Sequence, residues 1–307
     1  MTEQGWKASL IAVLKEHNGV KSGGSVASHA TQHKRHEDLF AGFTLLRQLG
    51  VKIDSVAQFR GKHMQALARH WESLGQAPST IQNKISTFRT FAGWIGKTGM
   101  IEGAEKYVSP GAASRSSINR CDKSWEAQGV DPASVLAAVR ARDPRIALQL
   151  ELQQVFGLRV RESLQLQPHL ADKGAYLAVN LGTKGGRDRV VLIDTPEKRE
   201  LIDRAKTFVT RESGSVSDPR KTLSQIKNYY YAVVRKAGIK REGGLGVTSH
   251  GLRHGYASNY YKKKTGVASP VRGGSPVDRD ADRAARIDLA EELGHSRESI
   301  TTHYLGR

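Results

Sequence analysis

Apolar side chains in the first hundred residues recur at helical spacing, interrupted by glycines and polar turns. Trp6, Leu10 and Leu14, for example, fall on one face of the first such segment, which ends before Gly19. Four segments of this kind predict helices over residues 3–17, 26–49, 55–74 and 78–95. The last of them opens at Pro78-Ser79, where Ser79 is a plausible N-cap. A small four-helix domain over residues 1–107 is the result.

The periodicity stops over residues 108–120, VSPGAASRSSINR, which are small and polar and therefore indicate a linker. A second domain follows over residues 121–307. Its expected helices begin at Asp131-Pro132 and continue over 144–166, 197–211, 220–237, 249–263, 284–293 and 297–304.

A strand signal occurs in the second domain, where AYLAVNL (175–181) and RVVLI (189–193) flank a glycine-rich turn. Two β-rich runs joined in this way predict a hairpin. The fold class expected for the chain is therefore mainly α with a small β-hairpin.

The charge balance indicates a polyanionic partner. Lysine and arginine number 48 against 30 acidic residues, which gives a net charge of +18 and an isoelectric point near 10.0. Residues 1–120 carry 16 basic and eight acidic side chains, so neither domain holds the excess alone. Both halves of the chain therefore suit nucleic acid. In the first domain Lys84, Arg89 and Lys97 lie between the apolar stripes and are the DNA-facing candidates.

Other classes of protein fit the composition poorly. No run approaches 18 apolar residues, and the N-terminus lacks the basic and apolar regions of a signal peptide. Cys121 is the single cysteine, so an internal disulfide or a CxxC site is excluded. His33 and His36 lack further ligands nearby, so no metal site is expected. A cytoplasmic protein fits best.

Cleaving a phosphodiester without a metal requires a nucleophile, cations for the non-bridging oxygens and an acid for the leaving oxygen. Arginine suits the oxygens because its guanidinium is always charged and donates in a fork. Lysine or histidine suits proton transfer, and a tyrosine phenol suits a covalent intermediate. The second domain contains all of these residue types in a defined order.

The order is that of five short motifs. They are Gly157-Leu158-Arg159-Val160-Arg161-Glu162-Ser163, the turn Gly182-Thr183-Lys184-Gly185-Gly186, Ser249-His250-Gly251-Leu252-Arg253-His254, Leu293-Gly294-His295-Ser296, and Tyr304. Taken alone, each motif has an ordinary explanation, such as a surface arginine, a solvated hairpin tip or a packing tyrosine. Together they resemble the tyrosine recombinase (phage integrase) family, with its GLRxxE box, hairpin lysine, HxLR box, LGH box and nucleophile. The resemblance covers about 145 residues of the second domain.

The resemblance implies a role for each residue. Tyr304 would attack the scissile phosphate and form a 3′-phosphotyrosyl link, while Arg159 and Arg253 hold the non-bridging oxygens. Lys184 would protonate the 5′ oxygen, and His250 would act as base or proton relay. The remaining expectations are that His295 hydrogen-bonds the phosphate, that Glu162 orients Arg159 and that Arg187, Lys262, Lys263 and Lys264 contact DNA.

The resemblance also implies how such an enzyme works on DNA. A helical core-binding domain and a catalytic domain would form a C-shaped clamp on a double-stranded recombination site. A homotetramer would join two such sites, with neither metal nor ATP as cofactor and with an accessory directionality factor as a possible further partner. The expected activity is site-specific integration or excision of a mobile element, in a nucleoid-associated protein of a bacterium or phage.

Two features depart from the family pattern. Arg253 and His295 are 42 residues apart, and the excess lies in 262–286, which carries seven basic and three acidic residues. We expect a mobile basic loop there that orders on DNA or on a neighbouring subunit. Three residues follow Tyr304, fewer than the tail helix of many relatives needs, and no separate arm-binding domain is expected at the N-terminus.

Two other functions remain open from the sequence. One is a DNA-binding protein on the same scaffold that does not cut and acts as an architectural or regulatory factor. The other is a topoisomerase-like or resolvase-like enzyme that uses the same tyrosine chemistry for relaxation or end closure. Because every expected catalytic residue type is present, a non-cutting protein is the weaker of the two.

Overall fold

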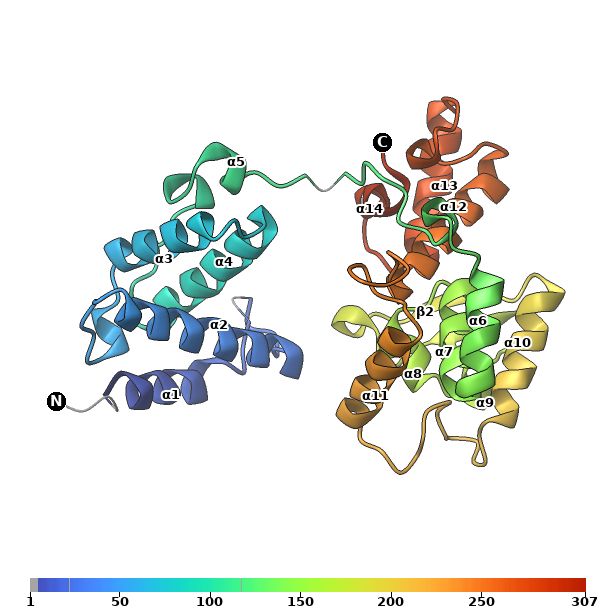
Figure 1. Cartoon of the computed structure of the whole chain (residues 1–307), viewed down its shortest axis with the longest axis horizontal. Coiled ribbons are helices and arrows are strands. Elements are labelled where there is room, and N and C mark those ends of the chain that lie inside the picture. The colour runs from blue at the N-terminus through green and yellow to red at the C-terminus, as the bar shows by residue number, and fades with distance from the viewer. Residues whose placement is uncertain (1–4, 22, 117) are drawn as a thin grey trace. The chain divides into compact units, whose positions relative to one another are not determined.

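The computed structural model describes residues 5–21, 23–116 and 118–307, and the chain divides into two compact units, Met1–Ser116 and Ser117–Arg307. Each unit is built around its own apolar core. The division falls inside the segment 108–120 expected to be a linker. Figure 1 shows helices throughout both units and a short hairpin in the second.

Unit 1 is helical. Its helices are α1 (Gly5–His17), α2 (His29–Gln48), α3 (Gly61–Ser73), α4 (Pro78–Trp94) and the four-residue α5 (Pro110–Ala113), with 3₁₀ turns at Val56–Gln58 and Ala104–Lys106. The four-helix prediction is confirmed. The segment expected as one helix over 55–74 is instead a 3₁₀ turn followed by α3. Residues 108–113 belong to unit 1, since Val108 is buried in its core and the Gln82 amide donates to the Ala113 carbonyl.

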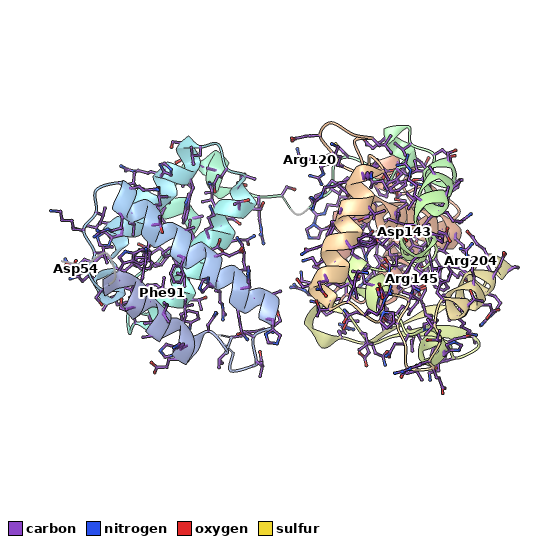
Figure 2. All side chains as sticks on the ribbon, turned by 60° about the horizontal axis from the view of Figure 1, so that its bottom comes forward. Asp54, Phe91, Arg120, Asp143, Arg145 and Arg204 are labelled. Atoms are coloured by element: carbon purple, nitrogen blue, oxygen red, sulfur yellow. The ribbon has the colours of Figure 1, made fainter. Side chains whose placement is uncertain are left out.

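Four phenylalanines form the centre of unit 1. Phe43, Phe59, Phe88 and Phe91 are at most 1% exposed, with ring centroids 5.2 to 6.3 Å apart. Figure 2 shows Phe91 among the side chains between the helices. Aromatic groups of this size contribute most of the buried apolar area in so small a domain.

Unit 2 is larger and mixed. Its helices are α6 (Pro132–Arg142), α7 (Pro144–Val155), α8 (Val160–Gln165), α9 (Pro168–Ala171), α10 (Pro196–Thr207), α11 (Leu223–Lys236), α12 (Ser249–Thr265), α13 (Arg279–Glu292) and α14 (Thr302–Leu305). Its 3₁₀ turns are Glu126–Gln128, Lys184–Gly186, Pro270–Arg272 and Glu298–Thr301. Helix α7 packs against α6, α8, α10, α11 and α12, so its residues 146–153 are buried on every side.

The hairpin pairs β1 (Tyr176–Val179) with β2 (Arg189–Leu192) in antiparallel register, as the sequence predicts. Val179 lies opposite Arg189, and Val191 and Arg189 are the buried residues of β2. An arginine therefore occupies a position that alternation assigns to the core. In the connecting turn, a Cβ on Gly182 (φ 76°) would lie 2.4 Å from the Arg161 carbonyl oxygen, so only glycine fits there.

The irregular segment expected over 262–286 is shorter in the structure and covers 266–278, with a 3₁₀ turn at Pro270–Arg272. Residues 262–265 complete α12 and α13 begins at Arg279, five residues before its expected start. Between the two helices, Ser269 is fully buried and bonded to Ser258, and Arg272 pairs with Asp122 at 2.7 Å. The segment therefore packs as part of unit 2.

The core of unit 1 generates a stability prediction. A Cβ at Gly42, on α2, would lie 2.4 Å from Cζ of the fully buried Phe88, which has no room to retreat. We expect Gly42→Ala to lower the free energy of unfolding of unit 1 by roughly 1–3 kcal/mol through overpacking. Gly93→Ala on α4 is the matched control, because its nearest neighbouring atom is 3.8 Å away. The better helix propensity of alanine should then raise stability by about 0.5–1 kcal/mol.

Urea unfolding followed by tryptophan fluorescence measures both changes, since Trp6, Trp71 and Trp94 lie in unit 1. If the two alanine variants shift the midpoint equally, the close contact between Gly42 and Phe88 is not tight in solution.

Candidate active site

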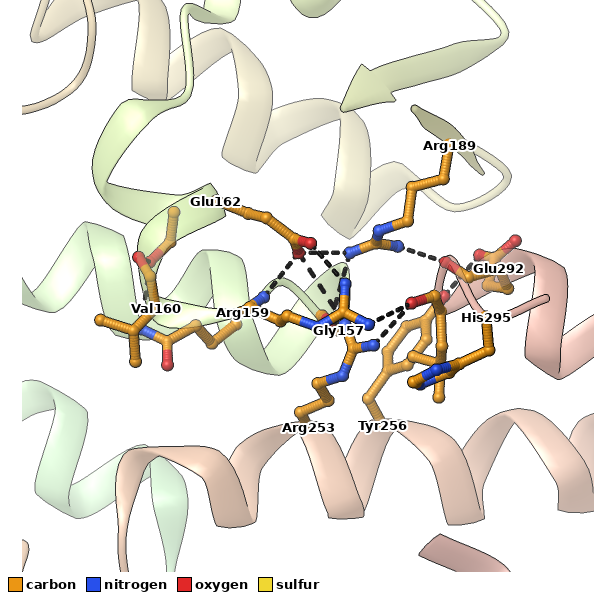
Figure 3. A network of polar contacts seen from close by, with 12 residues as sticks. Gly157, Arg159, Val160, Glu162, Arg189, Arg253, Tyr256, Glu292 and His295 are labelled. Carbon is orange, nitrogen blue, oxygen red and sulfur yellow. Dashed lines mark hydrogen bonds and ion pairs between the residues drawn. The ribbon is translucent and has the colours of Figure 1, made fainter. Parts of the chain in front are cut away.

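A buried carboxylate organises three arginines at the centre of unit 2 (Figure 3). Glu162, on α8, is fully buried and accepts from Arg159 Nη1 at 2.6 Å and from Arg189 Nη2 at 2.8 Å. Its Oε2 lies 3.9 Å from Arg253 Nη1. Burial alone would raise the pKa of the Glu162 carboxyl, but the charges of Arg189, Arg253 and Arg159 outweigh burial and lower it to about 2.

Local sequence explains why Glu162 faces Arg159. Arg159 is the N-cap of α8, and Glu162 is three residues later, so the carboxylate reaches back to the Arg159 backbone N–H at 2.7 Å. This is the geometry of a capping box with an acidic residue at its third helical position. The same carboxylate thereby fixes both the start of the helix and the guanidinium, as the sequence predicts for Glu162.

Two backbone carbonyls, one in the LGH box and one in the first arginine box, accept hydrogen bonds from the guanidinium groups. The Leu293 carbonyl accepts from Arg159 Nη2 at 3.0 Å and from Arg253 Nη2 at 2.7 Å. The Gly157 carbonyl accepts from Arg253 Nη1. The first arginine box, the HxLR box on α12 and the LGH box after α13 therefore meet through hydrogen bonds.

Tyr304, on α14, lies against this cluster. Its hydroxyl oxygen accepts from Arg253 Nε at 3.2 Å and lies 3.4 Å from His295 Nε2. Arg253 is completely buried and Tyr304 is only 6% exposed. Of the two arginines expected to hold the phosphate, Arg159 and Arg253, the phenol therefore contacts Arg253 directly.

Three imidazoles surround the phenol ring. The ring centroids of His250, His254 and His295 lie 6.0, 4.9 and 5.8 Å from that of Tyr304. Burial, together with the neighbouring cations, lowers the pKa of His250 to about 4 and those of His254 and His295 to about 3. All three rings are consequently neutral near pH 7 in the DNA-free protein. A neutral ring nitrogen can accept the proton of the phenol.

The site opens into a cavity of about 670 Å³ lined chiefly by basic and aromatic residues. Its lining comprises Lys123, Arg159, Lys184, Gly185, Arg187, Arg241, His250, His254, Gly294, His295, Ser296, Ile300, His303 and Tyr304. Arg159, Lys184, His250, His295 and Tyr304 were all expected to act together and share this one cavity. Arg253 lies behind the lining and contacts it through Tyr304.

Most of the candidate DNA-contact residues lie outside the cavity. Arg187 lines the cavity, and Lys262, Lys263 and Lys264 are exposed at the end of α12, where Lys263 and Lys264 pair with Asp194 and Asp288. The three candidates of unit 1 are Lys84, Arg89 and Lys97. Each donates a hydrogen bond within its own unit. Lys84 donates to the Gln76 side chain, Arg89 to the Ile101 and Glu102 carbonyls, and Lys97 to the Ala57 and Phe59 carbonyls. Their role in DNA contact stays a prediction.

The sequence interpretation missed Arg189 and His254. Arg189 is 6% exposed and donates to Glu162 and to the Glu292 carbonyl, and a Cβ on Gly294 would lie 2.6 Å from its Cδ. An arginine at an inward position of an alternating strand indicates a buried anion nearby, and the sequence of the second strand shows Arg189 at such a position. His254 is four residues after His250 and therefore shares its helix face.

Tyr256 also does more than pack. Its hydroxyl donates to the Glu292 carboxylate at 2.5 Å. Its ring lies so close to Gly157 (φ 58°) that a Cβ on Gly157 would be 2.5 Å from Cδ1 of Tyr256. Gly157 is therefore fixed by a close approach as well as by its backbone conformation.

No helix in the described part of the chain is long and apolar enough to cross a membrane. Within residues 5–21, 23–116 and 118–307, no group of three or more histidine, cysteine, aspartate or glutamate side chains is placed to hold a metal ion.

Comparisons with known proteins agree with the geometry. The family model described as "Integrase" matches residues 117–259, and the one described as "Phage integrase, N-terminal" matches residues 15–101. The tyrosine recombinase XerA of Thermococcus kodakarensis is 28% identical over 178 residues, which cover 56% of this chain and 53% of the relative. The chain resembles integrases in both of its units, and these matches support a tyrosine recombinase. It aligns with about half the length of this curated relative.

Solved structures share the fold. A lambda integrase fragment (residues 75–356), determined as a dimer bound to a COC′ core site, aligns with a TM-score of 0.62 at 18% identity and covers 97% of this chain and 94% of that one. The Tn1549 transposon integrase in complex with transposon right-end DNA aligns with a TM-score of 0.59 at 12% identity, over 97% and 95% of the two chains.

The carboxylate of Glu162 generates the second prediction. Its pKa is lower in the folded protein (about 2) than the ordinary value of 4.5, so its contribution to stability is present above about pH 4.5 and is lost as the pH falls towards 2. Glu162→Gln should therefore lower the free energy of unfolding of unit 2 by about 3 kcal/mol near pH 7. The deficit should shrink between pH 4.5 and 2.

Denaturant unfolding at a series of pH values measures this difference between the variant and the native chain. A deficit that stays constant down to pH 2 would show that the carboxylate is not held by the three arginines.

Proposed function

We propose that the protein is a site-specific DNA recombinase that cleaves and rejoins DNA through a 3′-phosphotyrosyl intermediate. The observation that carries the proposal is the hydrogen bond from buried Arg253 to the Tyr304 hydroxyl, beside a cavity that is also lined by Arg159, Lys184 and several imidazoles, His250 and His295 among them. The proposal includes double-stranded DNA as substrate and a homotetramer on two sites. Among the relatives, lambda integrase has been determined as a tetramer bound to a Holliday junction, which supports both parts.

The proposed chemistry assigns one task to each group. The Tyr304 oxygen attacks phosphorus, and its proton passes to a neutral imidazole, His250 in our assignment, with His295 beside the phenol. Arg159 and Arg253 hold the two non-bridging oxygens as negative charge increases in the transition state. The bond from phosphorus to the 5′ oxygen breaks, and Lys184 donates the proton that converts this oxygen to a hydroxyl. The reverse steps rejoin the strand.

The phosphate must displace existing contacts to reach both arginines. Arg253 is enclosed by Gly157, Leu293 and Tyr304, whereas Arg159 is 19% exposed by its side chain and faces the cavity. Arg159 is thus available for a first contact. Arg253 becomes available when the phenol turns from the guanidinium to phosphorus.

Integration or excision of a mobile element is the form of recombination that we favour. One matching family model is described as "Integrase" and the other as "Phage integrase, N-terminal", and one structural relative is a transposon integrase. A topoisomerase-like enzyme of the same chemistry differs in that it relaxes supercoiled DNA without joining two sites.

Covalent trapping tests the proposal. On a DNA substrate with a nick beside the scissile phosphate, the short 5′-hydroxyl strand diffuses away and the covalent complex accumulates. We expect the native chain to form this complex and Tyr304→Phe to lose it completely, because phenylalanine has no nucleophile. Tyr176→Phe, a change of the same kind at an exposed tyrosine of β1, should trap normally. A native chain that binds the DNA and never traps it would instead be a non-cutting binding protein.

The role of Lys184 has its own test. In a substrate whose bridging 5′ oxygen is replaced by sulfur, the leaving thiolate needs no proton, since its pKa is far below that of an alcohol. Lys184→Ala should slow cleavage of ordinary DNA by about 10²–10⁴-fold and restore most of the rate on the sulfur substrate. Tyr304→Phe should stay inactive on both. Equal slowing of Lys184→Ala on the two substrates would remove Lys184 from the role of acid.

A further inference from the structure

The nucleophile is carried by a helix that cannot hold itself in place. Helix α14 has four residues, Thr302–Leu305, and isolated helices of that length are unstable. The C-terminal carbonyls of any helix also need external donors. The position of the Tyr304 hydroxyl therefore depends on whatever holds α14.

The segment by which the chain enters unit 2 makes that contact. Asn119 lies two residues after Ser117, where unit 2 begins, and is only 5% exposed. Its backbone N–H donates to the Thr302 carbonyl at 2.9 Å, and its Nδ2 donates to the Tyr304 carbonyl at 3.3 Å. One residue thus satisfies carbonyls at both the start and the end of the short helix.

Two further observations show that this contact is built into the fold. A Cβ on Gly306 (φ 74°) would lie 3.0 Å from the Asn119 carbonyl oxygen. A residue with a side chain at position 306 would therefore displace the Asn119 carbonyl. Arg272 clamps the same entry segment by donating to Asp122 Oδ2 at 2.7 Å and to Ser124 Oγ at 3.1 Å.

The Asn119 side chain is also expensive to bury. Its Oδ1 is buried without a hydrogen-bond partner among the described residues, which is unfavourable. An apolar residue would fill the slot without that cost, so stability alone does not account for an asparagine here. The hydrogen bond from its amide N–H to the Tyr304 carbonyl accounts for the asparagine.

We propose that Asn119 is a positioning residue for the nucleophile, holding α14 so that the Tyr304 hydroxyl meets Arg253. The inference rests on the proposed cleavage function.

Asn119→Asp and Asn119→Ala test the proposal. The aspartate keeps the shape of the side chain but points an acceptor at the Tyr304 carbonyl, and the alanine removes the donor. We expect both variants to slow single-turnover covalent trapping at least tenfold, since small displacements of a nucleophile have large effects on rate. DNA affinity in a gel-shift assay should stay near the native value for both variants, and so should the thermal unfolding midpoint of Asn119→Ala. Asn119→Asp should lower the midpoint, because it buries a charged carboxylate against a carbonyl oxygen. Asn228→Asp, the same change at an exposed position of α11, should leave the trapping rate unchanged.

The sulfur-bridged substrate separates a positioning role from other roles. Slowing by the Asn119 variants should persist on that substrate, because the nucleophile and not the leaving group is affected. The proposal is overturned if the Asn119 variants trap DNA at the native rate, or if the sulfur substrate restores their rate. It is also overturned if the DNA affinity and the unfolding midpoint of Asn119→Ala fall as far as its trapping rate does. A native chain that forms no Tyr304-dependent adduct would overturn the proposed function itself.

Discussion

The active site depends on one buried carboxylate that holds three guanidinium groups. Three like charges gathered in a protein interior repel one another and lose their hydration, which is unfavourable unless an anion and hydrogen-bond acceptors compensate. Glu162 supplies the anion, and the Gly157 and Leu293 carbonyls supply acceptors. The compensation is incomplete, so a net positive charge remains. A DNA phosphate would supply the missing negative charge, and affinity for the substrate and organisation of the site therefore have the same physical cause.

Burial lowers the pKa values of the imidazoles, and the same excess of charge lowers them further. Cations beside His250 and His295 disfavour a further proton, so both rings remain acceptors in the free protein. Binding of a phosphate reduces the local positive potential and moves those pKa values upward. The site is thus arranged to accept a proton at the moment when the negatively charged substrate is present.

Much of this arrangement could be predicted from the sequence because its components are local. The GLRVRE segment encodes both Arg159 and the capping carboxylate Glu162 within four residues, and His250 and Arg253 share a helix face by spacing alone. Arg189 was missed because an arginine in a strand is usually exposed, and its buried alternation position was not weighed. The contact of Asn119 with Tyr304 joins residues 185 apart in sequence, and no local pattern reports such a pairing. The irregular segment expected over 262–286 was placed correctly in its middle, but its two ends are helical, and the contacts of Ser269 and Arg272 with unit 2 could not be read from glycine, proline and charge.

The central claim is that the phenol of Tyr304 is the group that becomes joined to DNA. The most direct measurement is mass spectrometry of the covalent complex after digestion with protease and nuclease. The account predicts a nucleotide attached through its 3′ phosphate to the peptide that contains Tyr304. A nucleotide found on another tyrosine, such as one of Tyr229, Tyr230 and Tyr231, or a linkage through a 5′ phosphate, would contradict it.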